Sequence, residues 1–263
     1  MLEEESVYVS GNIFLQNEKL YWNSGTKNIK IGKNNWNHYI GDLGWAKLEK
    51  GWNTRFKKLA PCRRFNSYYC LKDCGEDGDC LFSCVAHAFN NNKSIDTHIF
   101  EDTMRQKTAS GITNANFKSI LETYILEKNL DEFEGMWDPY TIETLSELQD
   151  ELSMSGNNFW GDHICIQLLS QVLNLNFIML NSPEEELSEL ERTYTLHSLC
   201  LPFDVAKETI ILYYLDQIHF QLVGYFNGDI VQTIFKFKDL PLEILKMYQI
   251  DCRQNILGTE ILT

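Results

Sequence analysis

The segment that most constrains this chain spans residues 74–89, where a turn rich in Gly and Asp runs directly into an apolar stretch. From residue 81 onward, apolar side chains recur at i, i+3, i+4 and i+7, which is the spacing of one helical face. The members of this face are Phe82, Val85, Ala86 and Phe89, and Leu81, Cys84 and Ala88 widen it. The pattern predicts a largely buried helix that begins at or beside Cys80.

A cysteine at the start of a helix is well placed to act as a nucleophile. The unpaired backbone N–H groups and the positive end of the helix macrodipole both favour the thiolate, which is the reactive form. Gly75 and Gly78 allow the preceding backbone to fold tightly, so that successive N–H groups can point at one place, as an oxyanion hole requires. The expected donors of this hole are the backbone N–H groups of Asp77, Gly78 and Cys80.

Zinc binding is the main alternative for the cysteines in this region. Cys70, Cys74, Cys80 and Cys84 lie close together in the sequence, but their spacing is not Cys-x2-Cys and the last two fall on the predicted core helix. We therefore expect no metal and no cofactor.

Composition indicates a globular protein and restricts its partners. With 263 residues, of which 44% are hydrophobic, the chain can fill a sizeable core. A net charge of −14 argues against nucleic acid and anionic membranes as partners, and it favours a basic partner. We find no secretory leader and no apolar run of membrane-spanning length, and the eight cysteines suit a reducing compartment. The expectation is an intracellular, cytoplasmic monomer.

The pattern of apolar residues predicts an α+β protein with three parts. Residues 1–58 form a β-rich N-terminal extension, residues 59–250 a catalytic domain and residues 251–263 a tail. Short strands are expected at 7–9, 13–15, 20–22 and 29–31, and later strands at 177–180, 194–199, 209–215, 219–226 and 230–237. Helices are expected from residue 80, near 97–108, from 117 with Asn114 as N-cap, after Thr141, after Asp162 and at 241–249. Residues 183–192 are expected to form an acidic, solvated loop.

Three separated motifs resemble the ovarian-tumour (OTU) family of cysteine proteases. Residues 77–82, Asp-Gly-Asp-Cys-Leu-Phe, resemble its Asp-Gly-Asn-Cys-Leu-Phe signature, with Asp79 in place of Asn. Residues 219–223, His-Phe-Gln-Leu-Val, resemble the late strand that carries the family's histidine, and residues 160–162, Trp-Gly-Asp, resemble the entry to its central helix. The motifs occur in the family's order and span roughly residues 60–240.

The resemblance implies a papain-like OTU fold, with a short central sheet flanked by two helical groups. It implies a deubiquitinase that hydrolyses isopeptide or peptide bonds after the C-terminal Gly-Gly of ubiquitin or a ubiquitin-like modifier. Cys80 would be the nucleophile and His219 the general base, and Trp160 and Phe220 would line the channel for the Gly-Gly segment. Frequent Asn, Ile and Lys favour an AT-rich genome, consistent with a viral source acting in the host cytoplasm.

The third catalytic residue and the activity itself remain open at this level. Gln221 lies two positions after His219, hence on the same face of the strand, and could accept the Nδ1 proton of the imidazole. Asp73 and Asp77 are the alternatives. The functional alternatives are an impaired OTU-like module that binds ubiquitin without cutting, and a cysteine protease that acts on ordinary peptide bonds, such as those of a viral polyprotein.

Overall fold

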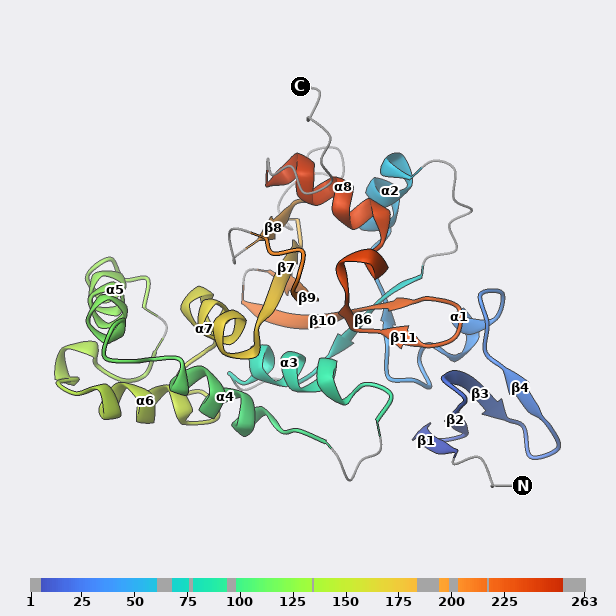
Figure 1. The fold of residues 1–263 in the computed structure, drawn as a ribbon, viewed down its shortest axis with the longest axis horizontal. Helices are drawn as coiled ribbons and strands as arrows, with labels where there is room; N and C mark the ends of the chain where they lie inside the picture. Colours follow the sequence, from blue (N-terminus) through green and yellow to red (C-terminus); the bar gives the residue numbers. More distant parts are fainter. Residues whose placement is uncertain are drawn as a thin grey trace.

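The computed structural model describes residues 6–60, 68–75, 78–93, 98–133, 135–183, 194–198, 203–216 and 218–252. Its N-terminal part is a four-stranded antiparallel sheet in the order β1-β2-β3-β4 (Figure 1). The strands are β1 (Val7–Ser10), β2 (Ile13–Gln16), β3 (Lys19–Asn23) and β4 (Asn28–Lys30). The four N-terminal strands predicted from the sequence are therefore confirmed.

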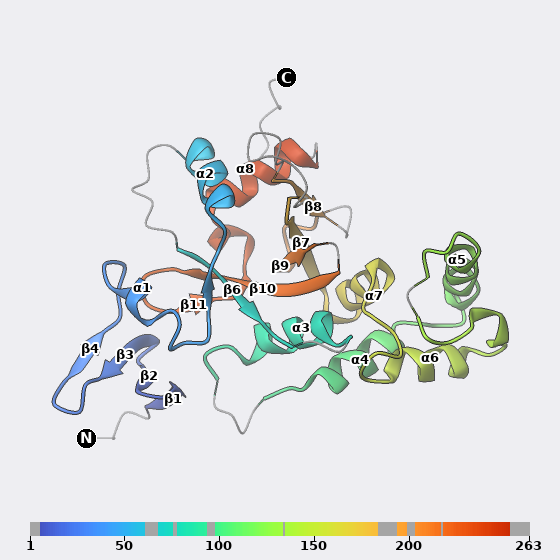
Figure 2. The ribbon, with the colours of Figure 1, turned by 180° about the vertical axis from the view of Figure 1, so that it is seen from behind.

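The Trp-rich segment after this sheet joins the body of the protein. It forms α1 (Trp36–Tyr39), β5 (Ala46–Lys47) and α2 (Lys50–Leu59). β5 pairs with β6 (Tyr69–Asp73) of the main sheet, and α2 lies beside the C-terminal helix α8 (Leu242–Asp251) in both views (Figures 1 and 2). The main sheet thus includes residues from before the predicted boundary at residue 58.

The main sheet has eight strands among the described residues. Its order is β5-β6-β10-β9-β7-β8, and β11 and β12 pair with β10 and β9. The strands not yet given are β7 (Leu175–Asn181), β8 (Leu196–Ser198), β9 (Glu208–Leu215), β10 (His219–Phe226), β11 (Val231–Gln232) and β12 (Ile234–Phe235). β7 and β9 run parallel, whereas the other described pairs are antiparallel.

Alternating side chains of this sheet fill two cores, one on each face. On one face Phe177, Leu212 and Leu222 belong to the cluster that includes the buried sides of α3 (Cys80–Asn90), α4 (Glu101–Ser110) and α7 (His163–Leu173). On the other face, Ile211 and Val223 pack in the cluster of α2 and α8. Helices on both faces confirm the predicted α+β arrangement with two helical groups (Figures 1 and 2).

The helix starts confirm some predicted caps and correct others. Asp162 caps α7 by accepting a 2.8 Å hydrogen bond from the Cys165 N–H, as predicted. Thr144, rather than Thr141, caps α6 (Leu145–Ser153), because residues 139–141 form the 3-10 turn η2 (Pro139–Thr141). Asn116, rather than Asn114, precedes α5 (Phe117–Asn129). The remaining element is η3 (Phe237–Asp239), and most of the predicted acidic loop lies outside the described residues.

Candidate active site

Cys80 is the first residue of α3, where that helix packs against β10. The residue is 5% exposed, and the Phe220 backbone forms a hydrogen bond with its sulfur. One helical turn further, the Cys84 Sγ donates to the Phe220 carbonyl at 3.4 Å. Cys80 is therefore seated against the strand position next to His219, the first residue of β10.

The environment of Cys80 raises the pKa of its thiol. Burial raises its pKa more than the backbone hydrogen bonds of Phe220, Leu81 and Cys80 itself lower it, and the charge of Asp73 raises it slightly. The helix start thus supplies the N–H groups that the sequence predicts, and these lower the pKa of the Cys80 thiol, but burial raises that pKa by more. Cys80 needs a neighbouring base to become nucleophilic.

Alkylation of Cys80 by iodoacetamide should therefore rise with pH and keep rising above the usual range of a free thiol. The raised pKa means that the thiolate fraction is small at neutral pH and grows as the pH approaches that pKa. Mass spectrometry of the Cys80 peptide over a pH series measures this. The control is the exposed cysteine of a short peptide. If Cys80 reached half of its maximal alkylation rate at a lower pH than this control, the result would contradict the expectation.

His219 is oriented by Asp73, the last residue of β6. Its Nε2 lies 3.1 Å from the Asp73 Oδ1, and because a carboxylate oxygen only accepts, Nε2 carries the proton. This tautomer leaves Nδ1 of His219 free to act as the base. The pair forms across strands, since Asp73 lies directly opposite Gln221 in the register and His219 is two residues away on the same face.

Gln221 does not take the place predicted for it at this imidazole. The hydrogen bond described for the ring goes to Asp73 and uses Nε2, whereas the prediction for Gln221 used Nδ1. The structure therefore favours Asp73, one of the two alternatives. The other alternative, Asp77, lies outside the described residues together with its backbone N–H, the first of the three expected oxyanion donors.

Asp73→Ala should lower kcat by roughly one to two powers of ten, and Gln221→Ala by much less. The loss should stay below that for a buried aspartate orienter, because the Asp73 side chain is 57% exposed and its charge is screened. Asp216→Asn, an exposed aspartate in the turn before His219, is the matched control. If Asp73→Ala kept the wild-type kcat while Gln221→Ala lost it, Gln221 rather than Asp73 would be the residue that orients His219.

Trp160 and Phe220, the two predicted channel walls, occupy different positions. Trp160 is 36% exposed and lies against the turn before Cys80, where a Cβ on Gly78 would come within 2.9 Å of its indole Cδ1. Phe220 is 5% exposed and stacks on Tyr214 with ring centroids 4.6 Å apart. Phe220 as a substrate wall stays a prediction: its ring packs in the core cluster, and its backbone forms hydrogen bonds with Cys80 and Cys84.

The sequence reasoning missed Arg105. This residue of α4 is fully buried and forms an ion pair with Asp79, the residue that immediately precedes Cys80. A signal was available in the sequence, because Arg105 lies beside Met104 and three residues before Thr108 on what proves to be the buried side of α4. A buried arginine needs an anionic partner, and Asp79, the residue by which the 77–82 motif departs from the signature it resembles, is that partner.

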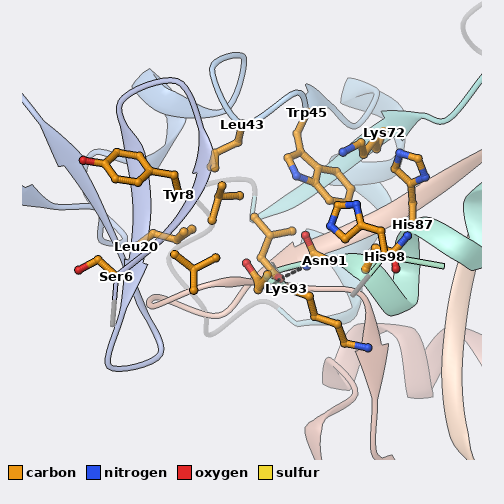
Figure 3. A pocket seen from close by; sticks show the side chains of 15 residues that line it. Ser6, Tyr8, Leu20, Leu43, Trp45, Lys72, His87, Asn91, Lys93 and His98 are labelled. Carbon is orange, nitrogen blue, oxygen red and sulfur yellow. Dashed lines mark hydrogen bonds between the residues drawn. The ribbon is translucent and has the colours of Figure 1, made fainter. Parts of the chain in front are cut away.

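A separate cavity of about 620 Å³ lies at the C-terminal end of α3, away from Cys80 (Figure 3). Its lining includes His87 and Lys72 beside the indole of Trp45, and on the opposite side Tyr8 and Leu43. Cys80 is not among the described residues that line this cavity. His87, whose Nδ1 lies 3.1 Å from the Ser83 carbonyl, belongs to this cavity.

We searched the described part of the chain for metal sites and for membrane-spanning helices. No group of three or more His, Cys, Asp or Glu side chains there is arranged to hold a metal ion. None of the helices in the same ranges is both long enough and apolar enough to cross a membrane.

Comparisons with known proteins place this geometry in context. Residues 75–220, more than half of the chain, match the family model described as OTU-like cysteine protease. No curated protein matches the sequence.

Among solved structures, the OTUD1 OTU domain is 18% identical with a TM-score of 0.39, covering 64% of this chain and 91% of that one. The viral OTU domain protease of Dera Ghazi Khan virus is 17% identical, with a TM-score of 0.40 and coverage of 63% and 88%. A Wolbachia pipientis wMel OTU deubiquitinase bound to ubiquitin is 11% identical, with a TM-score of 0.41 and coverage of 62% and 99%.

Proposed function

Because this chain belongs to the OTU-like cysteine protease family, we propose that it is a deubiquitinase that uses Cys80 as nucleophile and His219 as general base. Its substrate would be an isopeptide or peptide bond after the C-terminal Gly-Gly of ubiquitin or a ubiquitin-like modifier. The observation that carries the proposal is the placement of Cys80 at the start of a buried helix, against the strand that begins with a histidine bound to Asp73.

In the first half of the reaction, Nδ1 of His219 takes the proton of the Cys80 thiol. The resulting thiolate attacks the carbonyl carbon of the terminal glycine, and the oxyanion that forms is stabilised by backbone N–H groups of the turn before α3. Asp73 stabilises the imidazolium through the Nε2 hydrogen bond. The imidazolium then gives its proton to the leaving lysine amine, which leaves a thioester on Cys80.

In the second half, His219 accepts a proton from water as the water attacks the thioester. The tetrahedral intermediate collapses, the carboxylate of ubiquitin is released and the Cys80 sulfur recovers its proton. The charge of the protein suits this substrate. At −14 the chain attracts a modifier whose tail ends in Arg-Gly-Gly and whose binding face is partly basic.

The test is a substrate panel that separates the candidate activities. It contains ubiquitin and ubiquitin-like modifiers carrying a C-terminal fluorogenic amide, lysine-linked ubiquitin dimers and an unmodified, unfolded polypeptide. We expect hydrolysis of the modifier substrates and none of the polypeptide. Saturable binding of ubiquitin without hydrolysis would support the impaired module instead, and cleavage of the polypeptide alone would support an ordinary peptidase.

A further inference from the structure

Asp79 and Arg105 form a buried ion pair directly before the nucleophile. The Arg105 Nε donates to the Asp79 Oδ1, and the guanidinium lies over the Phe82 ring with its central carbon 4.2 Å from the ring centroid. The Arg105 side chain is 0% exposed and that of Asp79 is 17% exposed. The pair therefore joins α4 to the first turn of α3 with little solvent between them.

The same arginine fixes the direction of the peptide before Asp79. Its Nη2 donates to the Gly78 carbonyl at 3.0 Å. In a trans peptide the carbonyl and the following N–H point in opposite directions, so this bond also sets where the Asp79 N–H points. Gly78 has a φ of +85°, which glycine adopts without strain. Because glycine is also freer than other residues to leave this conformation, contacts from outside the turn help to hold its N–H groups in place.

The pair also holds the loop that carries Trp160. Arg105 Nη2 donates to the Phe159 carbonyl at 2.9 Å and to the Gly156 carbonyl at 3.3 Å. In return, the Gly156 N–H donates to the Asp79 Oδ2 at 2.8 Å. A Cβ on Gly78 would lie 2.4 Å from the Gly156 carbonyl oxygen, so turn and loop are in direct contact. One ion pair therefore connects the candidate oxyanion turn to the candidate channel wall.

Stability alone does not explain this arrangement. A buried ion pair is often no better for stability than apolar residues of the same shape. Arg105 Nη1 is buried without a hydrogen-bond partner among the described residues, which adds a desolvation cost. What the pair does supply is a fixed orientation for the two segments beside Cys80.

We propose that Asp79 and Arg105 are a positioning pair, in which the guanidinium aligns the oxyanion turn with the Trp160 loop and neutralises the carboxylate beside Cys80. An unpaired carboxylate at position 79 would oppose both the Cys80 thiolate and the oxyanion formed during hydrolysis. The inference rests on the proposed function in one respect, since the oxyanion belongs to that reaction.

The titratable groups described around the two residues can be held constant. Asp73 at the end of β6 acts on Cys80 and is hydrogen-bonded to His219. Cys84 on α3 interacts with both Cys74 and Cys80. Cys165 of α7 is a further titratable group, and the charge of Arg105 lowers its pKa. None of them is changed in the variants below, so differences in pH dependence report on the pair itself.

The test compares Arg105→Met, Asp79→Asn, the double variant and Arg105→Lys in two assays. One assay measures kcat and KM for ubiquitin with a C-terminal fluorogenic amide. The other follows iodoacetamide alkylation of Cys80 against pH, which needs neither ubiquitin nor an oxyanion hole. Arg55→Met is the matched control, because it removes the other described arginine–aspartate pair, between Arg55 of α2 and Asp251 of α8, on the opposite face of the sheet.

Arg105→Met should lower kcat on the order of 10²-fold, the scale of a small misplacement of catalytic groups, with a smaller change in KM. Its alkylation profile should shift to higher pH, whereas that of Asp79→Asn should shift to lower pH, because the two variants leave opposite charges unpaired. The double variant should return the profile to that of the wild type. Arg105→Lys should keep the wild-type profile and still lose kcat, because lysine keeps the charge but loses the planar fork.

Wild-type kcat and a wild-type profile in Arg105→Met would overturn the inference, as would shifts of both single variants in the same direction. If Arg105→Met does not fold, the profile of Asp79→Asn against wild type decides the question. A wild-type protein that does not hydrolyse the ubiquitin substrate would overturn the proposed function, while the alkylation profiles would still report on the pair.

Discussion

Replacing Cys80 with Ala is expected to reduce hydrolysis of ubiquitin substrates below detection. The variant loses the sulfur that forms the thioester, and no other group in the site can replace it. The fold should persist, since the change removes a single sulfur from a residue that is already small, at a cost on the order of 1 kcal/mol. Turnover of the fluorogenic ubiquitin amide and a thermal melt measure the two effects.

Cys252→Ala is the control for this experiment, because Cys252 follows α8 on the far side of the sheet. It should leave turnover unchanged. Affinity of Cys80→Ala for uncleaved ubiquitin should remain close to that of the wild type, as expected when only the chemical step is lost. Full activity in Cys80→Ala would reject the assignment of the nucleophile.

His219→Ala is expected to lower turnover by about three or more powers of ten, the scale seen when a nucleophile loses its base. The effect should be large here because burial raises the pKa of the Cys80 thiol. Without the imidazole, none of the described groups that act on Cys80 both removes the thiol proton and returns one to the leaving amine. In the wild type, kcat/KM should rise with pH, and this rise reflects the titration of the Cys–His pair as a unit. The same pH series should show no such rise in the variant.

His87→Ala and His163→Ala are the matched controls for the base. His87 lies beside the separate cavity, and His163 is an exposed residue in the first turn of α7. Both should retain near-normal turnover. Near-normal turnover in His219→Ala together with a loss in either control would move the base to that residue.

The helix at Cys80 could be predicted from sequence because its signal is local. Apolar spacing after Cys80, the glycines before it and the Asp162 cap each act within one turn of the chain, and the structure reproduces all three. The strand that begins with His219 was equally predictable, because its residues alternate between the two faces of the sheet.

The contacts of the site that cross between elements could not be predicted in the same way. Asp73 reaches His219 only because β6 pairs with β10 in a register that the sequence does not specify. Phe220 packs in the core cluster with α3 because of how that helix lies against β10, which no local sequence pattern specifies. The role of Arg105 could not be predicted because it depends on α4 packing beside the turn at Asp79, which lies 26 residues earlier in the chain.

Reaction of the protein with ubiquitin that carries an electrophile at its C-terminus tests the central claim most directly, because covalent capture reports the nucleophile and the substrate together. The account predicts one adduct of protein and ubiquitin, mapped by mass spectrometry to Cys80, absent in Cys80→Ala and slowed in His219→Ala. An adduct at Cys74 or Cys84, or no adduct from a folded protein, would contradict it.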